Sequence, residues 1–285
     1  MARKTAVKAT IVGGGYVGKE VARLWQQQGL TVTVTTTRPE RIDELQTVAD
    51  RVRVLTGTDI EALQDCLADQ QVVLVCVGSK RGANYRETYL GTAKTLAMVL
   101  PNTQVQQLIY TSTSSVYGQQ RSAVVTEETP VQPVTDNGDA IAQTERTLLA
   151  LLGLRVCVLR LGGIYGPGRT LAKIYSRAAG QTRPGTGDAI ANWVHLSDIV
   201  GAIEFGRQHN LSGIYNLVQD ETPTVRQLID TVCQRYDLAP VRWDPSQPSA
   251  RSHRARVSNA KIKAAGYQFR HPYFFEGGDF TALLT

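Results

Sequence analysis

Apolar stretches alternate with segments of helical spacing along the first part of the chain. Residues 6–12 form an apolar run that ends in three glycines, and apolar side chains then recur at helical spacing up to Gly29. Strands that read as continuous apolar runs between helices are typical of a parallel sheet covered on both faces. The pattern therefore predicts the α/β class, as a Rossmann-type doubly wound parallel sheet. Further strands are expected at 31–35, 51–55, 72–77, 107–111, 156–161 and 213–217, and further helices at 85–100, 138–152 and 197–207.

The pattern changes after Gly162, where strands become sparse and glycine and proline cluster. We expect residues 1–165 to form the nucleotide-binding Rossmann domain and residues 166–285 to form a smaller C-terminal substrate-binding subdomain. The helix and strand within 195–217 are expected to return to the main sheet.

The composition is that of a soluble globular protein, with 42% hydrophobic and 20% charged residues among 285. The apolar runs are far shorter than the roughly 20 residues that cross a bilayer, so we expect no membrane partner. The four cysteines form no C-x-x-C pair and the four histidines show no ligand spacing. We therefore expect a cytoplasmic protein with free thiols and no metal.

The net charge is +6, from 31 Lys and Arg against 25 Asp and Glu, and basic residues gather between 251 and 263. Such a run meets nucleic acid, an anionic small molecule or only water. The aromatic residues show no stacking pattern for bases, so we expect a small-molecule substrate and no nucleic acid.

The glycines that follow the first expected strand fit G-x-G-x-x-G and open a helix. In that context the first glycine permits a tight turn, the second lets backbone N–H groups approach a pyrophosphate, and the third lets helix and strand pack closely. The alternative is a glycine turn without a ligand. The predicted cofactor contacts here are Gly13, Gly15, Tyr16, Val17 and Gly18.

The end of the second expected strand carries hydroxyl and guanidinium groups where NAD-binding sequences carry an acid. Thr36, Thr37 and Arg38 supply donors and positive charge for a 2′-phosphate, whereas an aspartate would repel it. We predict that NADP(H) is preferred and that NAD(H) is the alternative cofactor. If Arg38 has no role in binding, it is simply an arginine exposed in a loop.

Several segments, in order along the chain, resemble the extended short-chain dehydrogenases/reductases of the NAD(P)-dependent epimerase/dehydratase family. The glycine turn is similar to that of the family's atypical members. The segments cover nearly the whole chain and are Tyr110-Thr-Ser-Thr-Ser-Ser-Val-Tyr-Gly118, Leu159-Arg-Leu-Gly-Gly-Ile-Tyr-Gly-Pro-Gly168, Val194-His-Leu-Ser-Asp198, Tyr215-Asn-Leu217 and Arg256-Val-Ser-Asn-Ala-Lys261.

The resemblance implies that Thr113, on the loop after the fifth strand, bonds to a hydroxyl or carbonyl of the substrate. It also places Val77, Gly78 and Ser79 beside the adenosine ribose. The family's Tyr-x-x-x-Lys pair is missing, because its two positions fall on Asn137 and Ile141 or one residue later. Ordinary epimerase chemistry therefore does not transfer directly.

Two other side chains are candidates for proton transfer. Tyr117 can replace the missing phenol or pack as a core tyrosine. His195, followed by Asp198, can act as a general acid or cap the helix that begins nearby.

An asparagine that often contacts nucleotide sugars in the family is replaced by Gly163. Predicted substrate contacts are Ser114, Tyr165, Asn192, Arg254 and Arg256.

Together these features predict an NAD(P)-dependent, epimerase/dehydratase-like oxidoreductase acting on a small substrate that is anionic or a sugar nucleotide. The alternative is a non-catalytic NADP(H)-binding sensor or assembly protein, which the missing Tyr-x-x-x-Lys pair favours. Relatives often dimerise through helices such as 85–100 and 138–152, so a homodimer is also an expectation.

Overall fold

The protein is described by a computed structural model covering residues 6–79, 82, 84–120, 123–249 and 255–275. The chain folds into two compact units. The first comprises Met1–Val116, Thr135–Arg160 and Val200–Tyr215, and the second comprises Tyr117–Val134, Leu161–Ile199 and Asn216–Thr285. The chain therefore passes between the units several times.

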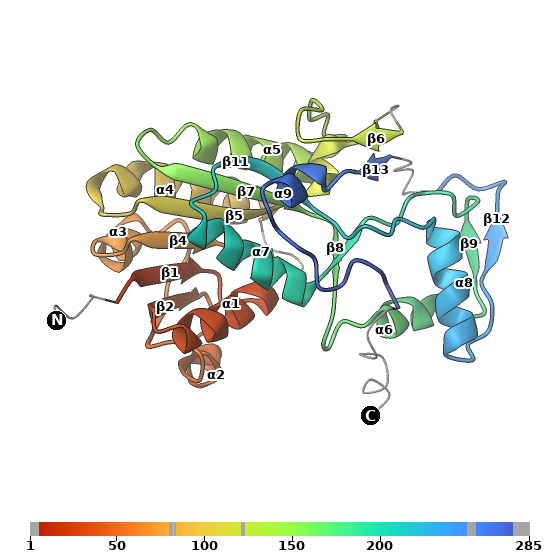
Figure 1. Ribbon diagram of the computed structural model, residues 1–285, viewed down its shortest axis with the longest axis horizontal. Helices are drawn as coiled ribbons and strands as arrows, with labels where there is room; N and C mark the ends of the chain where they lie inside the picture. The colour runs from red at the N-terminus through yellow and green to blue at the C-terminus, as the bar shows by residue number, and fades with distance from the viewer. Residues whose placement is uncertain (1–5, 80–81, 83, 121–122, 250–254, 276–285) are drawn as a thin grey trace. The chain divides into compact units, whose positions relative to one another are not determined.

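A seven-stranded sheet forms the centre of the first unit (Figure 1), in the order β11-β7-β5-β4-β1-β2-β3. The pairings among β1 to β5 are parallel. Order and direction confirm the predicted doubly wound α/β fold. The strands are β1 (Lys8–Val12), β2 (Thr31–Thr36), β3 (Arg51–Val54), β4 (Val72–Val75), β5 (Gln107–Thr113), β7 (Arg155–Leu161) and β11 (Gly213–Leu217).

Helices cover both faces of this sheet (Figure 1), with α4 and α5 on one face and α1 and α7 on the other. The indole of Trp25 on α1 donates to Glu204 on α7 at 2.9 Å and joins the second pair. The helices of this part are α1 (Tyr16–Gln27), α2 (Ile42–Gln46), α3 (Ile60–Leu67), α4 (Thr92–Val99), α5 (Asp136–Leu149) and α7 (Leu196–Gln208), with the short turn η1 (Pro39–Arg41) before α2.

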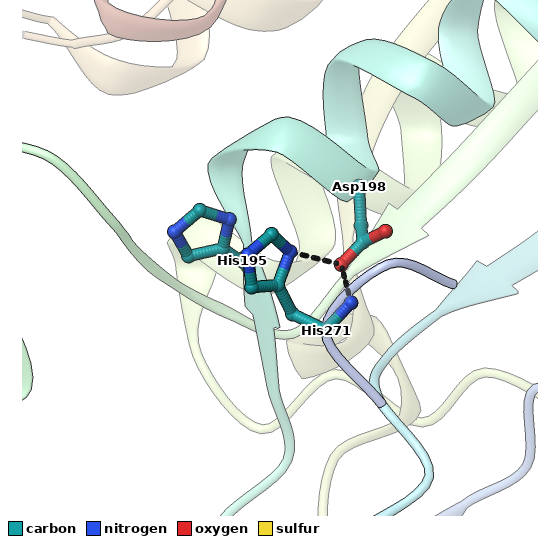
Figure 2. Close-up of side chains that lie close together, drawn as sticks. All are labelled: His195, Asp198 and His271. Atoms are coloured by element: carbon teal, nitrogen blue, oxygen red, sulfur yellow. Dashed lines mark hydrogen bonds and ion pairs between the residues drawn. The ribbon is translucent and has the colours of Figure 1, made fainter. Parts of the chain in front are cut away.

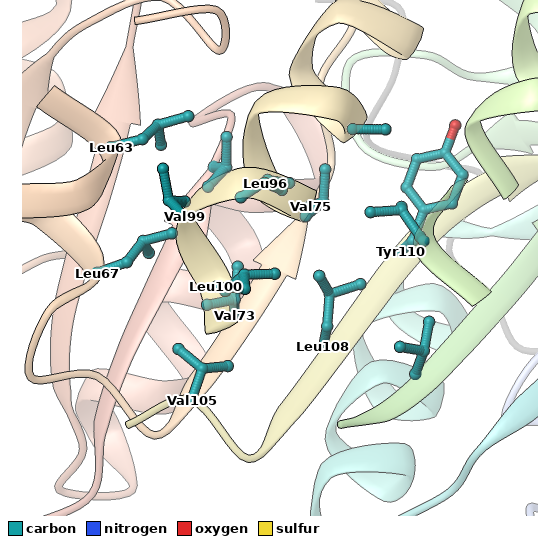
Figure 3. Packing of buried hydrophobic residues seen from close by; sticks show 14 of the residues in the cluster. Leu63, Leu67, Val73, Val75, Leu96, Val99, Leu100, Val105, Leu108 and Tyr110 are labelled. Carbon is teal, nitrogen blue, oxygen red and sulfur yellow. The ribbon is translucent and has the colours of Figure 1, made fainter. Parts of the chain in front are cut away.

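Apolar side chains of α3 and α4 pack on those of β4 and β5 in a continuous core (Figure 3). Leu96, Leu100, Val73 and Leu108 all belong to this core, and their side chains are buried. Because both faces of a parallel strand are covered, its apolar residues run without alternation, which is the pattern of the sequence.

The helix expected over 85–100 is not continuous. A π-helical turn, η2 (Glu87–Gly91), precedes α4, and the tight turn η3 (Leu100–Asn102) follows it. The hydroxyl of Thr88 donates to the carbonyl of Asn84 at 2.9 Å, and that of Thr92 donates to the carbonyl of Thr88 at 2.7 Å. Such bonds compete with the regular helical ladder.

Short parallel strand pairs and small helices build the second unit. Its larger core packs α6 and α8 around Tyr165, Ala191 and Phe274. The paired strands are β8 (Gly163–Tyr165) with β10 (Trp193–His195), β9 (Thr182–Pro184) with β12 (Arg242–Asp244), and β6 (Val124–Val125) with β13 (Arg256–Val257). The helices are α6 (Leu171–Tyr175), α8 (Val225–Arg235) and α9 (Ala260–Ala264), and η5 (Ser176–Ala178) is a tight turn. The tight turn η4 (Ser114–Tyr117) begins in the first unit and ends in the second.

The division of the chain differs in detail from the expected boundary at residue 165. Residues 117–134 and 161–165 fall in the second unit, whereas most of 195–217 falls in the first. All four cysteines are free thiols. Within the described ranges, no helix has the length and apolar character needed to cross a membrane.

Candidate functional site

The glycine turn between β1 and α1 has the backbone that a pyrophosphate site requires. Gly13 has φ +112, and a Cβ there would lie 2.7 Å from the Cys76 carbonyl oxygen. A Cβ on Gly18 would lie 2.1 Å from the Gly13 carbonyl oxygen, so helix and strand touch there. At Gly15 a Cβ would meet no described atom within 4 Å. The space over the start of α1 is therefore open.

Gly15 is the N-cap of α1, and no side chain caps this helix. The N–H groups of its first turn, which include those of Tyr16 and Val17, carry the positive end of the helix dipole. This arrangement fits the pyrophosphate of a dinucleotide, although binding by these residues stays a prediction.

The end of β2 is bonded to the glycine turn. The hydroxyl of Thr35 accepts the N–H of Gly13 at 3.1 Å, and the carbonyl of Thr35 accepts the N–H of Gly14 at 2.8 Å. Thr36 is buried, and its hydroxyl accepts the N–H of Arg38 at 3.1 Å. Thr37 is exposed and Arg38 is half-buried. Thr37 and Arg38 thus have side chains accessible for a ligand.

A second arginine lies at the glycine turn, and the sequence pattern did not single it out. Arg41 donates from Nη1 to the carbonyl of Gly14 and from Nε to Glu44 at 2.9 Å. Lys19 donates to Glu44 at 2.9 Å. Arg41 and Lys19 together lower the pKa of Glu44 to about 2. Arg41 follows Arg38 by one helical turn, and this spacing is the feature of the sequence that could have indicated it.

The residues after β4 lie beside the same turn. A Cβ on Gly13 would be 3.0 Å from the backbone nitrogen of Val77. Gly78 is exposed, and a Cβ there would meet no described atom within 4 Å. The N–H of Ser79 donates to the phenol oxygen of Tyr89 at 3.4 Å. The structure therefore brings together the glycine turn and the ends of β2 and β4.

Thr113 ends β5, and its hydroxyl is held in place by the next residues. It donates to the hydroxyl of Ser115 at 3.1 Å and accepts the N–H of Ser115 at 3.2 Å. Thr113 and Ser114 are half-buried. On α5 the positions matched to the absent catalytic pair carry an exposed Asn137 and a fully buried Ile141. Neither offers the acid and the cation of Tyr-x-x-x-Lys.

Tyr117 lies in the core of the second unit. Its side chain is 2% exposed and packs with Val125 and Val218. The phenol donates to the side-chain oxygen of Asn216 at 2.7 Å, and Asn216 donates to the carbonyl of Ser258 at 3.1 Å. These contacts match the packing alternative, and a catalytic role of Tyr117 stays a prediction.

His195 belongs to a compact hydrogen-bonded group at the start of α7 (Figure 2). The backbone N–H of Ser197 donates to Nδ1 of His195 at 3.2 Å, so neutral His195 carries its proton on Nε2. The Ser197 hydroxyl lies 2.8 Å from this nitrogen and 3.0 Å from Nδ1 of His271. The rings of the two histidines are 3.9 Å apart between centroids.

Asp198 completes this group from the first turn of α7. Its side chain is fully buried and accepts the backbone N–H groups of Arg270 at 2.6 Å and His271 at 3.0 Å. His195, Asp198 and His271 offer metal-ligand atoms that all lie within 4.8 Å of one another. These atoms already serve hydrogen bonds. His195 caps α7, which is the alternative that the sequence offered to a general-acid role. Its role as an acid and the absence of a metal both stay predictions.

The other predicted substrate contacts are distributed over the second unit. Tyr165 is buried, donates to Gln219 at 3.0 Å and lies edge-on to His195 with centroids 5.0 Å apart. Burial raises the pKa of the Tyr165 phenol. Asn192 binds the backbone beside Arg256, donating to the Ala255 carbonyl and accepting the Val257 N–H. Arg256 is exposed, and the prediction for Arg254 lies outside the described residues.

Comparison with known proteins decides the family. The sequence profile of the NAD dependent epimerase/dehydratase family matches residues 9–217. The chain belongs to this family. Protein YeeZ of Escherichia coli strain K12 is 29% identical in an alignment 272 residues long, which covers 93% of this chain and 96% of YeeZ. The UDP-glucose 4-epimerase of Corynebacterium glutamicum is 25% identical over 300 residues, covering 88% and 89%.

Members of the epimerase/dehydratase family also include solved structures with this fold. The UDP-glucose 4-epimerase of Thermus thermophilus, solved as a complex with NAD, superposes with a TM-score of 0.76 at 20% identity and covers 93% of this chain and 94% of that one. The family resemblance predicted from sequence motifs is therefore confirmed, and the fold agrees over nearly the whole chain.

Proposed function

We propose that this family member is an NADP(H)-dependent oxidoreductase whose cofactor binds across the glycine turn. The observation that supports this most directly is the open space at Gly15, at the start of a helix that no side chain caps. Gly13 and Gly18, on either side in the sequence, are in close contact with neighbouring backbone atoms. A Cβ at Gly15 would occupy the space through which backbone donors reach a phosphate.

Preference for NADP(H) is supported by the charge around the end of β2. Thr37 and Arg38 are accessible there, and Arg41 projects to the glycine turn from the neighbouring η1. Two guanidinium groups and a hydroxyl suit a 2′-phosphate, and the strand end carries no acid to bind a ribose hydroxyl. Arg41 needs only to exchange its bond to a carbonyl for one to the phosphate.

The bound dinucleotide would supply or take a hydride at its nicotinamide. Within the chain, Thr113 would exchange its bond to the Ser115 hydroxyl for one to the oxygen of the substrate, while the Ser115 N–H keeps the Thr113 oxygen in place. A hydrogen bond at this oxygen stabilises the negative charge that develops as hydride arrives. The exposed Arg256 favours an anionic substrate, and a sugar nucleotide is the class named for the similar epimerases.

Hydride transfer can be tested without guessing the substrate. NADPH carrying deuterium on one face of C4, and then on the other, is incubated with the protein and a metabolite extract, and loss of label is measured by mass spectrometry. We expect loss from one face only and at least a hundredfold slower loss with Thr113→Ala. A Thr129→Ala variant tests the same chemical change at a turn of the second unit.

Cofactor preference is tested by titrating NADPH and NADH. We expect Arg38→Ala and Arg41→Ala each to weaken NADPH binding about tenfold, roughly 1.4 kcal/mol, with little effect on NADH. Tighter NADH binding by the wild type, or an unchanged ratio in both variants, would contradict the assignment.

The buried Ile141 at the position of the family's lysine favours a second function, a non-catalytic NADP(H)-binding sensor. In that case NADPH binds but neither face of C4 loses deuterium. Absence of both binding and transfer would contradict the oxidoreductase and the sensor alike.

A further inference from the structure

Two tyrosines at the π-helical turn form a bonded pair of phenols. The rings of Tyr85 and Tyr89 are 4.5 Å apart between centroids. The Tyr85 hydroxyl donates to the Tyr89 oxygen, and burial together with this neighbour raises the pKa of Tyr85 to about 12. The Ser79 N–H donates to the same Tyr89 oxygen at 3.4 Å. One phenol oxygen thus accepts two hydrogen bonds.

Tyr85 and Arg86 immediately precede η2, and Arg86 ties this segment to α5. Arg86 donates to Gln143 at 2.7 Å and to Asp139 at 3.4 Å, both on α5. Asn84 caps the turn by accepting the N–H of Glu87 at 3.1 Å. Single π turns inside helices are frequent at functional sites, because they shift side chains that a regular helix would place elsewhere. Here the turn brings Tyr89 to Ser79.

A third phenol lies close to the pair. Tyr110 on β5 is fully buried. Burial, followed by the nearby Glu145, raises the pKa of Tyr110. No cation of the described chain contributes to the shifted pKa of Tyr85 or Tyr110. These two phenols therefore stay protonated at neutral pH.

We propose that Tyr89 is the proton donor of the reaction, that Tyr85 and the Ser79 amide hold its oxygen, and that the substrate is an aldehyde or ketone. The proposal rests on the oxidoreductase function above. Tyr89 is half-buried, and its oxygen accepts the N–H of Ser79, four residues beyond β4. β4 is the strand next to β5, which ends at Thr113. It would supply the phenol that α5 lacks.

The step balances as a carbonyl reduction. Bound NADPH would supply the hydride: its C4–H bond would break as a C–H bond forms at the carbonyl carbon, and the π electrons of the C=O bond would move to oxygen. That oxygen takes the proton of Tyr89, whose O–H electron pair stays on the phenol oxygen. The Ser79 N–H and the Tyr85 O–H stabilise this oxygen as its charge grows. A proton from water restores Tyr89, and an alcohol and NADP⁺ leave.

The test compares Tyr89→Phe, Tyr85→Phe and the control Tyr273→Phe in the deuterium-transfer assay. We expect transfer to fall at least a hundredfold with Tyr89→Phe, which removes the donor, and about tenfold with Tyr85→Phe, which removes a positioning group. The exposed Tyr273 should tolerate the same change. NADPH affinity, measured by fluorescence, should remain within a few-fold for all three variants.

The substrate class is tested with the same extract after reduction by borohydride, with the excess destroyed by acid. Aldehydes and ketones are then alcohols, so transfer from labelled NADPH should disappear. Undiminished transfer from the reduced extract would overturn the carbonyl assignment.

The phenol pair has a readout that needs no cofactor. Fast pH jumps monitored by phenolate absorbance give the titration of Tyr85 as the difference between each protein and its Tyr85→Phe counterpart. We expect the pKa of Tyr85 to move down from about 12 when Tyr89→Phe removes the neighbour that raises it. An unchanged titration, or a Tyr89→Phe variant that transfers deuterium like the wild type, would overturn the proposal alone. A wild-type protein that transfers none would overturn the proposed function with it.

Discussion

At the scale of single residues, the buried ion pair between Arg160 and Glu145 allows a prediction about stability. Arg160 on β7 donates to Glu145 on α5 at 2.7 Å, and the Ser112 hydroxyl donates to the same carboxylate at 2.5 Å. The two charged side chains are 4% and 3% exposed. Glu145→Gln leaves the guanidinium buried without its counter-charge, which should lower the free energy of unfolding by about 3–5 kcal/mol. Chemical denaturation measures this loss.

An exposed ion pair provides the control at the same scale. Asp65, 71% exposed, pairs with Arg53, and Asp65→Asn should cost less than about 1 kcal/mol because water screens the charges. Equal losses in Asp65→Asn and Glu145→Gln would show that burial does not set the strength of the Glu145–Arg160 pair.

At the scale of the element, the strand-turn-helix at the N-terminus separates packing from ligand binding. A Cβ on Gly18 would overlap the Gly13 carbonyl, whereas a Cβ on Gly15, with φ −79, would meet nothing described within 4 Å. Gly18→Ala should therefore lower the free energy of unfolding by about 1–3 kcal/mol or more. Gly15→Ala should change it by about 1 kcal/mol or less, yet weaken NADPH binding at least tenfold.

Thermal unfolding without cofactor and NADPH titration distinguish the two variants. If Gly15→Ala binds NADPH like the wild type, the pyrophosphate does not approach this residue, and the cofactor site proposed for the turn is wrong.

The helices, strands and turns differ in how well the sequence predicts them. The strands of the central sheet and the glycine turn could be predicted because each depends on neighbours in sequence, through apolar runs and turn residues. The π turn at Glu87–Gly91 could not be predicted, because the apolar spacing over 85–100 fits a regular helix. The proximity of His271 to His195 and of Tyr89 to Ser79 depends on tertiary folding, which no local spacing encodes. The fold could therefore be predicted from the sequence more fully than the candidate site could.

At the scale of the whole molecule, two strands and one α-helix continue across the division between the two units. The boundaries at 160/161, 199/200 and 215/216 fall inside β7, α7 and β11. Unfolding one unit would break backbone hydrogen bonds that continue into the other. We therefore predict a single cooperative transition, although the units have separate apolar cores.

The tryptophans allow this prediction to be tested. Trp25 lies in the first unit, and Trp193 and Trp243 lie in the second. A Trp25→Phe variant reports only on the second unit, and a Trp193→Phe/Trp243→Phe variant reports only on the first. In each variant the fluorescence midpoint in denaturant should coincide with that of its own circular dichroism. NADPH at about 100 times its Kd should stabilise both variants by about 2.7 kcal/mol, because binding at the first unit stabilises everything that unfolds with it. If NADPH shifts only the Trp25 signal, the units unfold independently and the continuous elements do not couple them.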